Sequence, residues 1–179
     1  MTSIRTTLVR APFVLVPLVL AGCVGKPVAP PARAPAPIVR PAPTPPAPPV
    51  ANWENGLLTP GRWTYTRDSR GGLALYGIAG SNAVLSIRCD TTARRVFISR
   101  MGSVAGSMTL RATSGARAYA ARPTAGTVPY VAADLTPTDP QLDALAFSRG
   151  RFLVGLSGAV DVVVPSWPEV ARVIEDCRG

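Results

Sequence analysis

The chain between residues 62 and 164 contains short segments in which hydrophobic and polar residues alternate. In residues 84–89, for example, Leu85, Ile87 and Cys89 fall on one face, and this period of two is typical of half-buried strands. Glycine-containing turns separate the segments. The other segments are residues 62–66, 95–100, 107–113, 117–122, 151–157 and 160–164, together with residues 73–79, which are continuously apolar. Their regular spacing predicts a mainly β fold, either an antiparallel β-sandwich or a barrel-like sheet.

Two short α-helices are predicted near the C-terminus. Residues 138–141 (Thr-Asp-Pro-Gln) favour the start of a helix that ends near Gly150. Residues 166–169 (Ser-Trp-Pro-Glu) fit a capping box, in which the serine and glutamate side chains each bond the other residue's backbone N–H. The second helix carries one apolar stripe, formed by Val170, Ile174 and Cys177.

The N-terminal residues follow a different pattern. Twelve uncharged residues (11–22) come after Arg5 and Arg10, and no acid precedes them. A helix needs about 20 apolar residues to cross the hydrocarbon core, so this run is too short to span a bilayer. A basic start, a short apolar core and small residues before a break are typical of a secretory signal. A buried N-terminal helix of the folded domain is the alternative.

The residues Leu20-Ala21-Gly22-Cys23 resemble the lipobox of bacterial lipoproteins. The resemblance implies that Cys23 carries a diacylglycerol on its sulfur, that the chain is cut after Gly22, and that the new amino terminus receives a fatty acid such as palmitate. One acyl chain gives marginal membrane binding, whereas two or more anchor a protein stably. Val24 stands where an acidic residue retains Gram-negative lipoproteins in the inner membrane, so the resemblance favours the outer membrane. An ordinary signal peptide, cleaved without lipid, is the alternative.

The composition divides the chain into three parts. Residues 1–22 form the signal peptide, residues 23–50 the lipidated N-terminus with a tether rich in proline and alanine, and residues 51–179 a single globular β-rich domain. Residues 26–50 hold eleven prolines and no acid. Because proline lacks a backbone donor, we expect a semi-rigid polyproline II spacer of roughly 3.1 Å per residue. A ligand for a proline-reading module is the alternative.

The charge of the chain gives little support to nucleic-acid binding. The net charge is +9, but five of the nineteen basic residues lie in the first 50 positions. Residues 51–179 hold fourteen arginines and all ten acids, and fourteen less ten leaves +4. The high isoelectric point therefore comes partly from the signal and the tether, and no nucleic-acid partner is expected.

Two cysteines lie on the predicted apolar faces. Cys89 faces inward from a strand and Cys177 from the last helix. Because a secretory signal implies an oxidising compartment, we expect these residues to form a disulfide that ties the helix to the sheet. Two free thiols are the alternative. No metal site is expected, because only two soft ligands are present and the chain has no histidine.

The composition also argues against most enzymes. Histidine is absent and the sole lysine, Lys26, lies in the tether, so the commonest general base and any Schiff-base lysine are missing from the domain. No glycine-rich phosphate loop is present, and no cofactor is predicted. Two pairs of carboxylates remain, Asp139 with Asp143 and Glu175 with Asp176, and they could hydrolyse a glycosidic bond if they flanked a cleft. Helix-dipole stabilisation and nearby arginines explain the same residues, so catalysis is not expected.

Arginines occupy several outward positions of the predicted strands, and Arg149 lies in the adjoining turn. Arginine binds carboxylates and phosphates through two parallel hydrogen bonds. Near an envelope, such anions include lipid A phosphates and peptidoglycan carboxylates. The candidate anion-binding residues are Arg111, Arg117, Arg149 and Arg151. Alternatively, these arginines and Arg62 solvate the outer faces of strands and discourage edge pairing.

Residues 142–179, LDALAFSRGRFLVGLSGAVDVVVPSWPEVARVIEDCRG, follow the order short helix, glycine turn, two strands, proline and capped final helix. This order resembles the C-terminal half of the IalB-like (invasion-associated locus B) periplasmic β-sandwich proteins. The family's glycine-phenylalanine pair in the last helix is absent, and its early cysteines are not matched. The resemblance rests on patterns of apolarity, so it supports the fold and carries no function.

Together these features predict a lipid-anchored cell-envelope protein with a non-catalytic binding or structural role in the periplasm. Its expected location is the outer membrane, facing the periplasm. The expected partners are the membrane, through the lipid anchor, and an envelope polymer or envelope protein. The alternative is a carboxylate-dependent hydrolase that acts on an envelope polymer.

Overall fold

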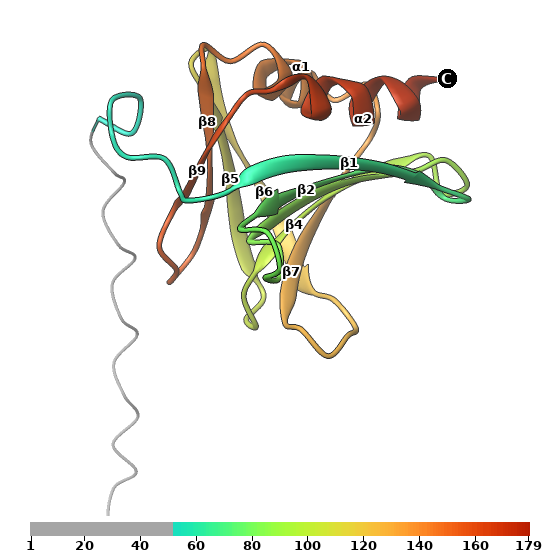
Figure 1. Cartoon of the computed structure of the whole chain (residues 1–179), viewed down its shortest axis with the longest axis horizontal. Coiled ribbons are helices and arrows are strands. Elements are labelled where there is room, and N and C mark those ends of the chain that lie inside the picture. The colour runs from blue at the N-terminus through green and yellow to red at the C-terminus, as the bar shows by residue number, and fades with distance from the viewer. Residues whose placement is uncertain (1–51) are drawn as a thin grey trace, which may run out of the picture. The chain divides into compact units, whose positions relative to one another are not determined.

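The computed structural model describes residues 52–179, so the signal, Cys23 and the tether lie outside the described residues. Nine antiparallel strands form one curled, half-barrel sheet in the order β1-β2-β3-β4-β7-β6-β5-β8-β9 (Figure 1). The mainly β, barrel-like fold predicted from the sequence is therefore confirmed. The strands are β1 (Arg62–Asp68), β2 (Gly71–Gly77), β3 (Leu85–Asp90), β4 (Arg95–Met101), β5 (Gly106–Ala112), β6 (Gly115–Pro123), β7 (Tyr130–Leu135), β8 (Arg151–Leu156) and β9 (Val162–Pro165).

Alternation places one set of side chains on the inner face of the curl. In β3 the inward residues Leu85, Ile87 and Cys89 are buried, and Ser86 and Arg88 between them are half-buried. Burial of such apolar side chains is the main favourable term in folding. Equivalent residues of the other strands complete the main core, which includes Tyr76, Val96, Ile98, Met108, Leu110, Val131, Phe152 and Val164.

Strands β8 and β9 do not alternate, because they are covered on both faces. Every residue from Phe152 to Leu156 is buried, and so are all four residues of β9. On the outer face, Trp53 from the segment before β1 packs with Leu153 and Val163 as a second, smaller core. A strand buried on both faces has no polar face to show in its sequence.

The segment before β1 also links the two edges of the sheet. The backbone N–H of Thr59 donates to the carbonyl of Val163 in β9 at 2.8 Å. In β1 itself, the indole N–H of Trp63 donates to the carbonyl of Pro165 at 2.8 Å. These two bonds draw β1 and β9 together although the two strands form no regular ladder.

Helices α1 (Pro140–Ala146) and α2 (Pro168–Arg178) lie together over one side of the curled sheet (Figure 1). Helix α1 contacts β5 and β6, and α2 contacts β2 and β3. Asp139 caps α1, as predicted, by accepting the N–H of Gln141 at 2.9 Å. The helix ends at Ala146, one turn earlier than the Gly150 end that the sequence predicted. Neither helix of the described part has the length and apolar character needed to cross a membrane.

The predicted capping box at residues 166–169 is wrong. Trp167 is the N-cap of α2, and no side chain caps the helix. The Ser166 hydroxyl instead contacts the carbonyls of Leu145 and Ala146 at 2.6 and 2.9 Å, and the Ser166 N–H donates to Gly150. Carbonyls in the last turn of a helix lack intrahelical partners, so Ser166 satisfies the end of α1 in place of the start of α2.

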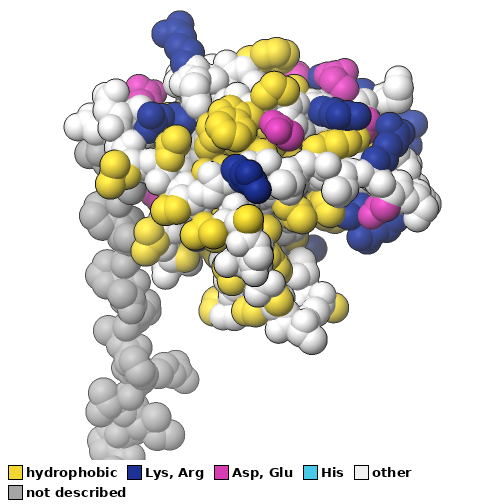
Figure 2. All heavy atoms as spheres, viewed as in Figure 1, with side chains coloured by type: hydrophobic (Ala, Val, Ile, Leu, Met, Phe, Trp, Pro, Cys, Tyr) yellow, Lys and Arg dark blue, Asp and Glu magenta, His cyan; other side chains and the backbone are white. Residues whose placement is uncertain are grey.

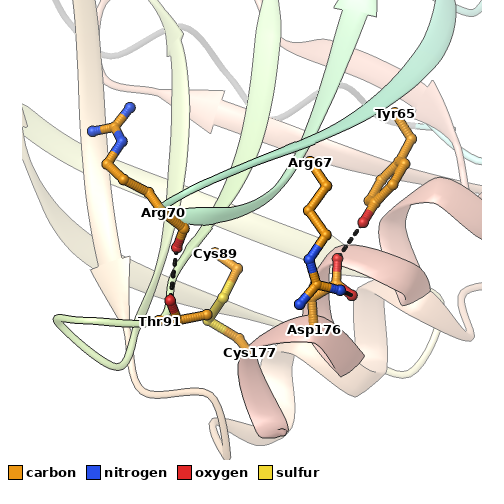
Figure 3. A network of polar contacts seen from close by, with 7 residues as sticks. All are labelled: Tyr65, Arg67, Arg70, Cys89, Thr91, Asp176 and Cys177. Atoms are coloured by element: carbon orange, nitrogen blue, oxygen red, sulfur yellow. Dashed lines mark hydrogen bonds and ion pairs between the residues drawn. A yellow bond between two sulfur atoms is a disulfide. The ribbon is translucent and has the colours of Figure 1, made fainter.

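The C-terminal end of α2 is attached to β1 and β3 (Figure 3). Cys89 and Cys177, the pair predicted from the sequence, form a disulfide with their Cα atoms 5.3 Å apart. Asp176, next to Cys177 in the last turn of α2, also holds this end of the helix. Its carboxylate accepts a hydrogen bond from the Tyr65 hydroxyl at 2.5 Å and pairs with Arg67 at 3.1 Å. A side chain at Gly72 would clash with the Asp176 carboxylate, so this glycine permits the close approach of α2.

Arg100 is buried on the inner face of β4, at 5 % exposure. Its two terminal nitrogens donate to the carbonyls of Val154 and Val160 at 2.9 and 2.7 Å. Burial lowers the pKa of this guanidinium, while the nearby Asp161 carboxylate opposes the change. The Nε of Arg100, also buried, has no hydrogen-bond partner among the described residues. Burying a cation is costly unless its donors are paired, and the two bonds that Arg100 makes tie β4 to the hairpin of β8 and β9.

Replacing both Cys89 and Cys177 with alanine is expected to lower the free energy of unfolding. The bridge joins residues 88 positions apart, for which loss of chain entropy in the unfolded state gives about 4–5 kcal/mol. Urea-induced unfolding of the oxidised chain and of the double variant measures the difference, with Cys23→Ser in both chains so that neither a lipid nor a thiol at that position contributes. A difference below about 1 kcal/mol would contradict a stabilising bridge.

Alkaline pH is expected to destabilise the fold through its tyrosines. The hydrogen bond to Asp176 raises the pKa of Tyr65, burial raises the pKa of Tyr76 and Tyr130, and burial together with Asp139 raises the pKa of Tyr119 to about 12. Because the folded values exceed the unfolded value, this stabilisation is complete below pH about 10 and is lost as the pH rises towards about 12. Phenolate absorbance, followed alongside unfolding, checks this: a tyrosine that ionises at its ordinary pKa in the intact fold would disagree.

Candidate functional site: a hollow where the sheet divides

The sheet divides between β6 and β7. Strand β6 pairs with β5 from Gly115 to Ala121, but it pairs with β7 only through Arg122 and Pro123. Beyond those two residue pairs β6 follows β5 away from β7. The divergence leaves a hollow of about 270 Å³, lined by Phe97, Ala120, Arg122, Pro123, Thr124, Ala132 and Asp134.

Strand register fixes the positions of the side chains that line the hollow. Phe97 of β4 lies opposite Asp134 of β7, and Ala132 lies opposite Arg122 of β6. Phe97 points outward because its neighbours Val96 and Ile98 face the core. Ala120 and Ala132 contribute small apolar side chains to the lining, which we call the alanine floor, and Phe97 and the polar groups line the rest.

The polar groups of the hollow have different electrostatic states. Asp134 is paired with Arg95 through two hydrogen bonds. The Arg95 guanidinium, with weaker attraction from Arg122, lowers the pKa of the Asp134 carboxyl, although partial burial opposes the shift. Arg122 is exposed, and no carboxylate of the described residues lies within ion-pairing distance of it. The hollow thus contains one ionised carboxylate whose charge is balanced by Arg95, and one guanidinium, that of Arg122, without an ion-pair partner among the described residues.

The candidate anion-binding arginines do not form a single cluster. Arg111 of β5 lies opposite Leu153, two residues from Arg151 on the adjacent strand β8. The N–H of Arg149 donates to the Thr113 hydroxyl at 3.1 Å, which places this turn beside the end of β5. These three arginines therefore share one corner of the sheet.

Two of the four arginines are already engaged. Arg117 pairs with Leu110, so it lies on the inner side of β6, where its guanidinium is 3.7 Å from Asp139. Arg151 donates to the carbonyl of Gly56 at 2.5 Å and so holds the segment before β1. Arg111 and Arg149 have no ion-pair partner among residues 52–179.

The candidate catalytic carboxylates have structural partners. Asp139 caps α1 and accepts the Tyr119 hydroxyl at 2.9 Å. Arg178 bridges the next two acids, with distances of 2.8 Å to Asp143 and 3.3 Å to Glu175. Asp176, the fourth, is held by Tyr65 and Arg67, and none of the four lines the hollow.

The hollow is suited to binding an anionic group that has an apolar neighbour. Arg122 can bind a carboxylate or phosphate through two parallel bonds, and the Phe97 ring and the alanine floor can contact an apolar group or the face of a sugar. Glycoside hydrolysis needs two carboxylates, and the lining contains one. The described residues bring together no three side chains of the kinds that hold a metal ion.

The residues of this hollow were not among those predicted from the sequence. Phe97 interrupts the alternation of its strand, since Val96, Phe97 and Ile98 are consecutive hydrophobic residues, and an aromatic residue on the outward face was the available signal. Arg122 and Asp134 carry no such signal, because they come together only through the pairing of β6 with β7 and β7 with β4. No protein-family model, curated protein or solved structure matches this chain.

Proposed function

We propose that this chain is a lipid-anchored protein of the bacterial envelope whose β domain has a non-catalytic binding role in the periplasm. The lipobox-like residues ending at Cys23 and the proline-rich stretch after them support the anchor and its spacer. The Cys89–Cys177 disulfide suits an oxidising compartment, because structural disulfides persist outside the cytosol. The outer membrane is the proposed site, since Val24 follows Cys23.

The observation that carries the binding role is the pairing state of the charges in the hollow. Asp134 is occupied by Arg95, whereas Arg122 stands beside Phe97 and the alanine floor without a carboxylate partner. An unpaired arginine next to an apolar wall favours a ligand with a carboxylate or phosphate. Peptidoglycan offers carboxylates next to small apolar groups, so we propose this envelope polymer as the ligand.

A non-catalytic role is favoured over hydrolysis by the partners of the carboxylates. Asp139, Asp143, Glu175 and Asp176 each contact an arginine, and the interactions of Asp139 and Asp176 with tyrosines hold helices in place. A general acid in glycoside hydrolysis needs a raised pKa. The one carboxyl group of the hollow, Asp134, has its pKa lowered.

The anchor is tested by metabolic labelling with a radioactive fatty acid. The native chain is expected to incorporate label and to sediment with membranes, whereas Cys23→Ser is expected to do neither. Separation of the inner and outer membranes should place the native chain in the outer fraction and move Val24→Asp towards the inner one. An unlabelled native chain, or label that persists in Cys23→Ser, would refute the anchor.

The binding role is tested by sedimentation with purified peptidoglycan sacculi. Removing a hydrogen bond to a charged group costs roughly 1.5–3 kcal/mol, so Arg122→Gln is expected to weaken retention by about tenfold or more. Added salt should weaken the native chain's retention as well. Arg62→Gln is the matched control, because Arg62 is also exposed on a strand of the same sheet but lies outside the hollow. Equal retention of the native chain and Arg122→Gln would count against the hollow as the binding site.

A further inference from the structure

Several of the most exposed hydrophobic side chains lie at one end of the β8–β9 hairpin. Leu57 is 96 % exposed, Phe147 78 % and Trp167 45 %, and Leu58 next to Leu57 is also exposed. We call these four residues the apolar end. Isolated surface hydrophobics are common, but a group of them marks an interaction site.

Hydrogen bonds bring these residues to the same end of the hairpin. The Ser166 hydroxyl contacts the carbonyl of Ala146. Trp167 is the residue after Ser166 and Phe147 is the residue after Ala146, so this contact brings the two aromatic residues to the same region. The Ser166 N–H donates to Gly150, and the Arg151 guanidinium donates to Gly56, the residue before Leu57. On the face shown in Figure 2, hydrophobic side chains gather where α1 meets the start of α2, with both basic and acidic side chains near them.

The described chain begins at this same end. Asn52 precedes Trp53, which packs on Leu153 and Val163 of the hairpin. The tether that leads to Cys23 therefore joins the domain beside the apolar end. The proposed anchor at Cys23 is thus connected to the domain through the segment that carries Leu57.

The composition of the apolar end matches a lipid headgroup layer. Tryptophan and phenylalanine have large apolar rings, and tryptophan is enriched where membranes meet water. Arg149 is exposed in the turn after Phe147, and Arg151 is half-buried nearby; Glu54 is the exposed acid of the adjacent segment. Arginines near the surface attract anionic lipids.

We propose that the apolar end rests on the headgroup layer of an anionic phospholipid bilayer, so that the domain docks on the membrane that holds its anchor. The inference extends the proposed lipid anchor, but the contact belongs to the folded domain itself. Leu57, Phe147 and Trp167 insert among the headgroups, and Arg149 contacts lipid phosphates. A domain docked in this way is not at the same time held away from the membrane by an extended tether, so the two arrangements exclude each other.

The test uses the chain of residues 23–179 with Cys23→Ser, which carries no lipid, and vesicles of phosphatidylethanolamine and phosphatidylglycerol. Trp53 and Trp63 are buried at 8 % and 4 % exposure, so a change in tryptophan emission reports mainly on Trp167. We expect a shift of the emission to shorter wavelength on vesicle binding and quenching by brominated lipid. Because each apolar side chain contributes on the order of a tenfold change in partitioning, Leu57→Glu and Phe147→Glu should each weaken binding by roughly tenfold or more.

Val160→Glu is the matched control. Val160 is 88 % exposed and lies in the turn at the opposite end of the same hairpin, so its substitution should leave vesicle binding unchanged. Absence of binding by the otherwise unsubstituted chain, or an equal loss in Val160→Glu, overturns the proposal. The chain lacks lipid in every arm, so these outcomes are independent of whether Cys23 is acylated, which fatty-acid labelling decides separately.

Discussion

The fold depends on covering the inner face of a sheet that curls without closing into a complete ladder of strands. Helix α2 provides this cover over β2 and β3, with Val170, Val173 and Ile174 buried against them. Each such side chain contributes about 1.5–3 kcal/mol when it leaves water. The helix is fixed at its C-terminal end by the disulfide and by Asp176, and Ser166 joins its approach to the end of α1. Without this attachment the apolar wall of β1, β2 and β3 would face solvent.

The segment before β1 connects this architecture to the proposed anchor. Trp53 covers β8 and β9, Thr59 bonds β9, and Arg151 bonds Gly56, so the part of the chain nearest the tether is built into the fold. A pull on the tether is therefore transmitted to the β8–β9 hairpin at the edge of the sheet. The same segment carries the exposed Leu57, one of the residues of the apolar end, so the proposed anchor and the proposed docking involve the same part of the chain.

The sequence was sufficient where one physical rule acted alone. Alternation located β1, β3, β4, β5 and β6, and the inward positions of Cys89 and Cys177 indicated the disulfide, because each pattern depends on near neighbours. Strand β7 (Tyr130–Leu135) was not predicted. The sequence was not sufficient where tertiary contacts competed with local ones. Ser166 bonds α1 and not its own helix, and Trp53 hides the outer face of β8 and β9. The hollow could not be predicted, because Arg122 and Asp134 meet only through strand pairings that no local pattern encodes.

Amide hydrogen exchange of the oxidised and reduced chain, read segment by segment, tests most directly whether the attachment of α2 holds the fold together. Reduction of the Cys89–Cys177 bond is predicted to remove protection first from α2 and from β1, β2 and β3, which it covers, while β5 and β8 keep theirs. Loss of protection that is uniform over the domain, or that leaves α2 as protected as before, would contradict the account.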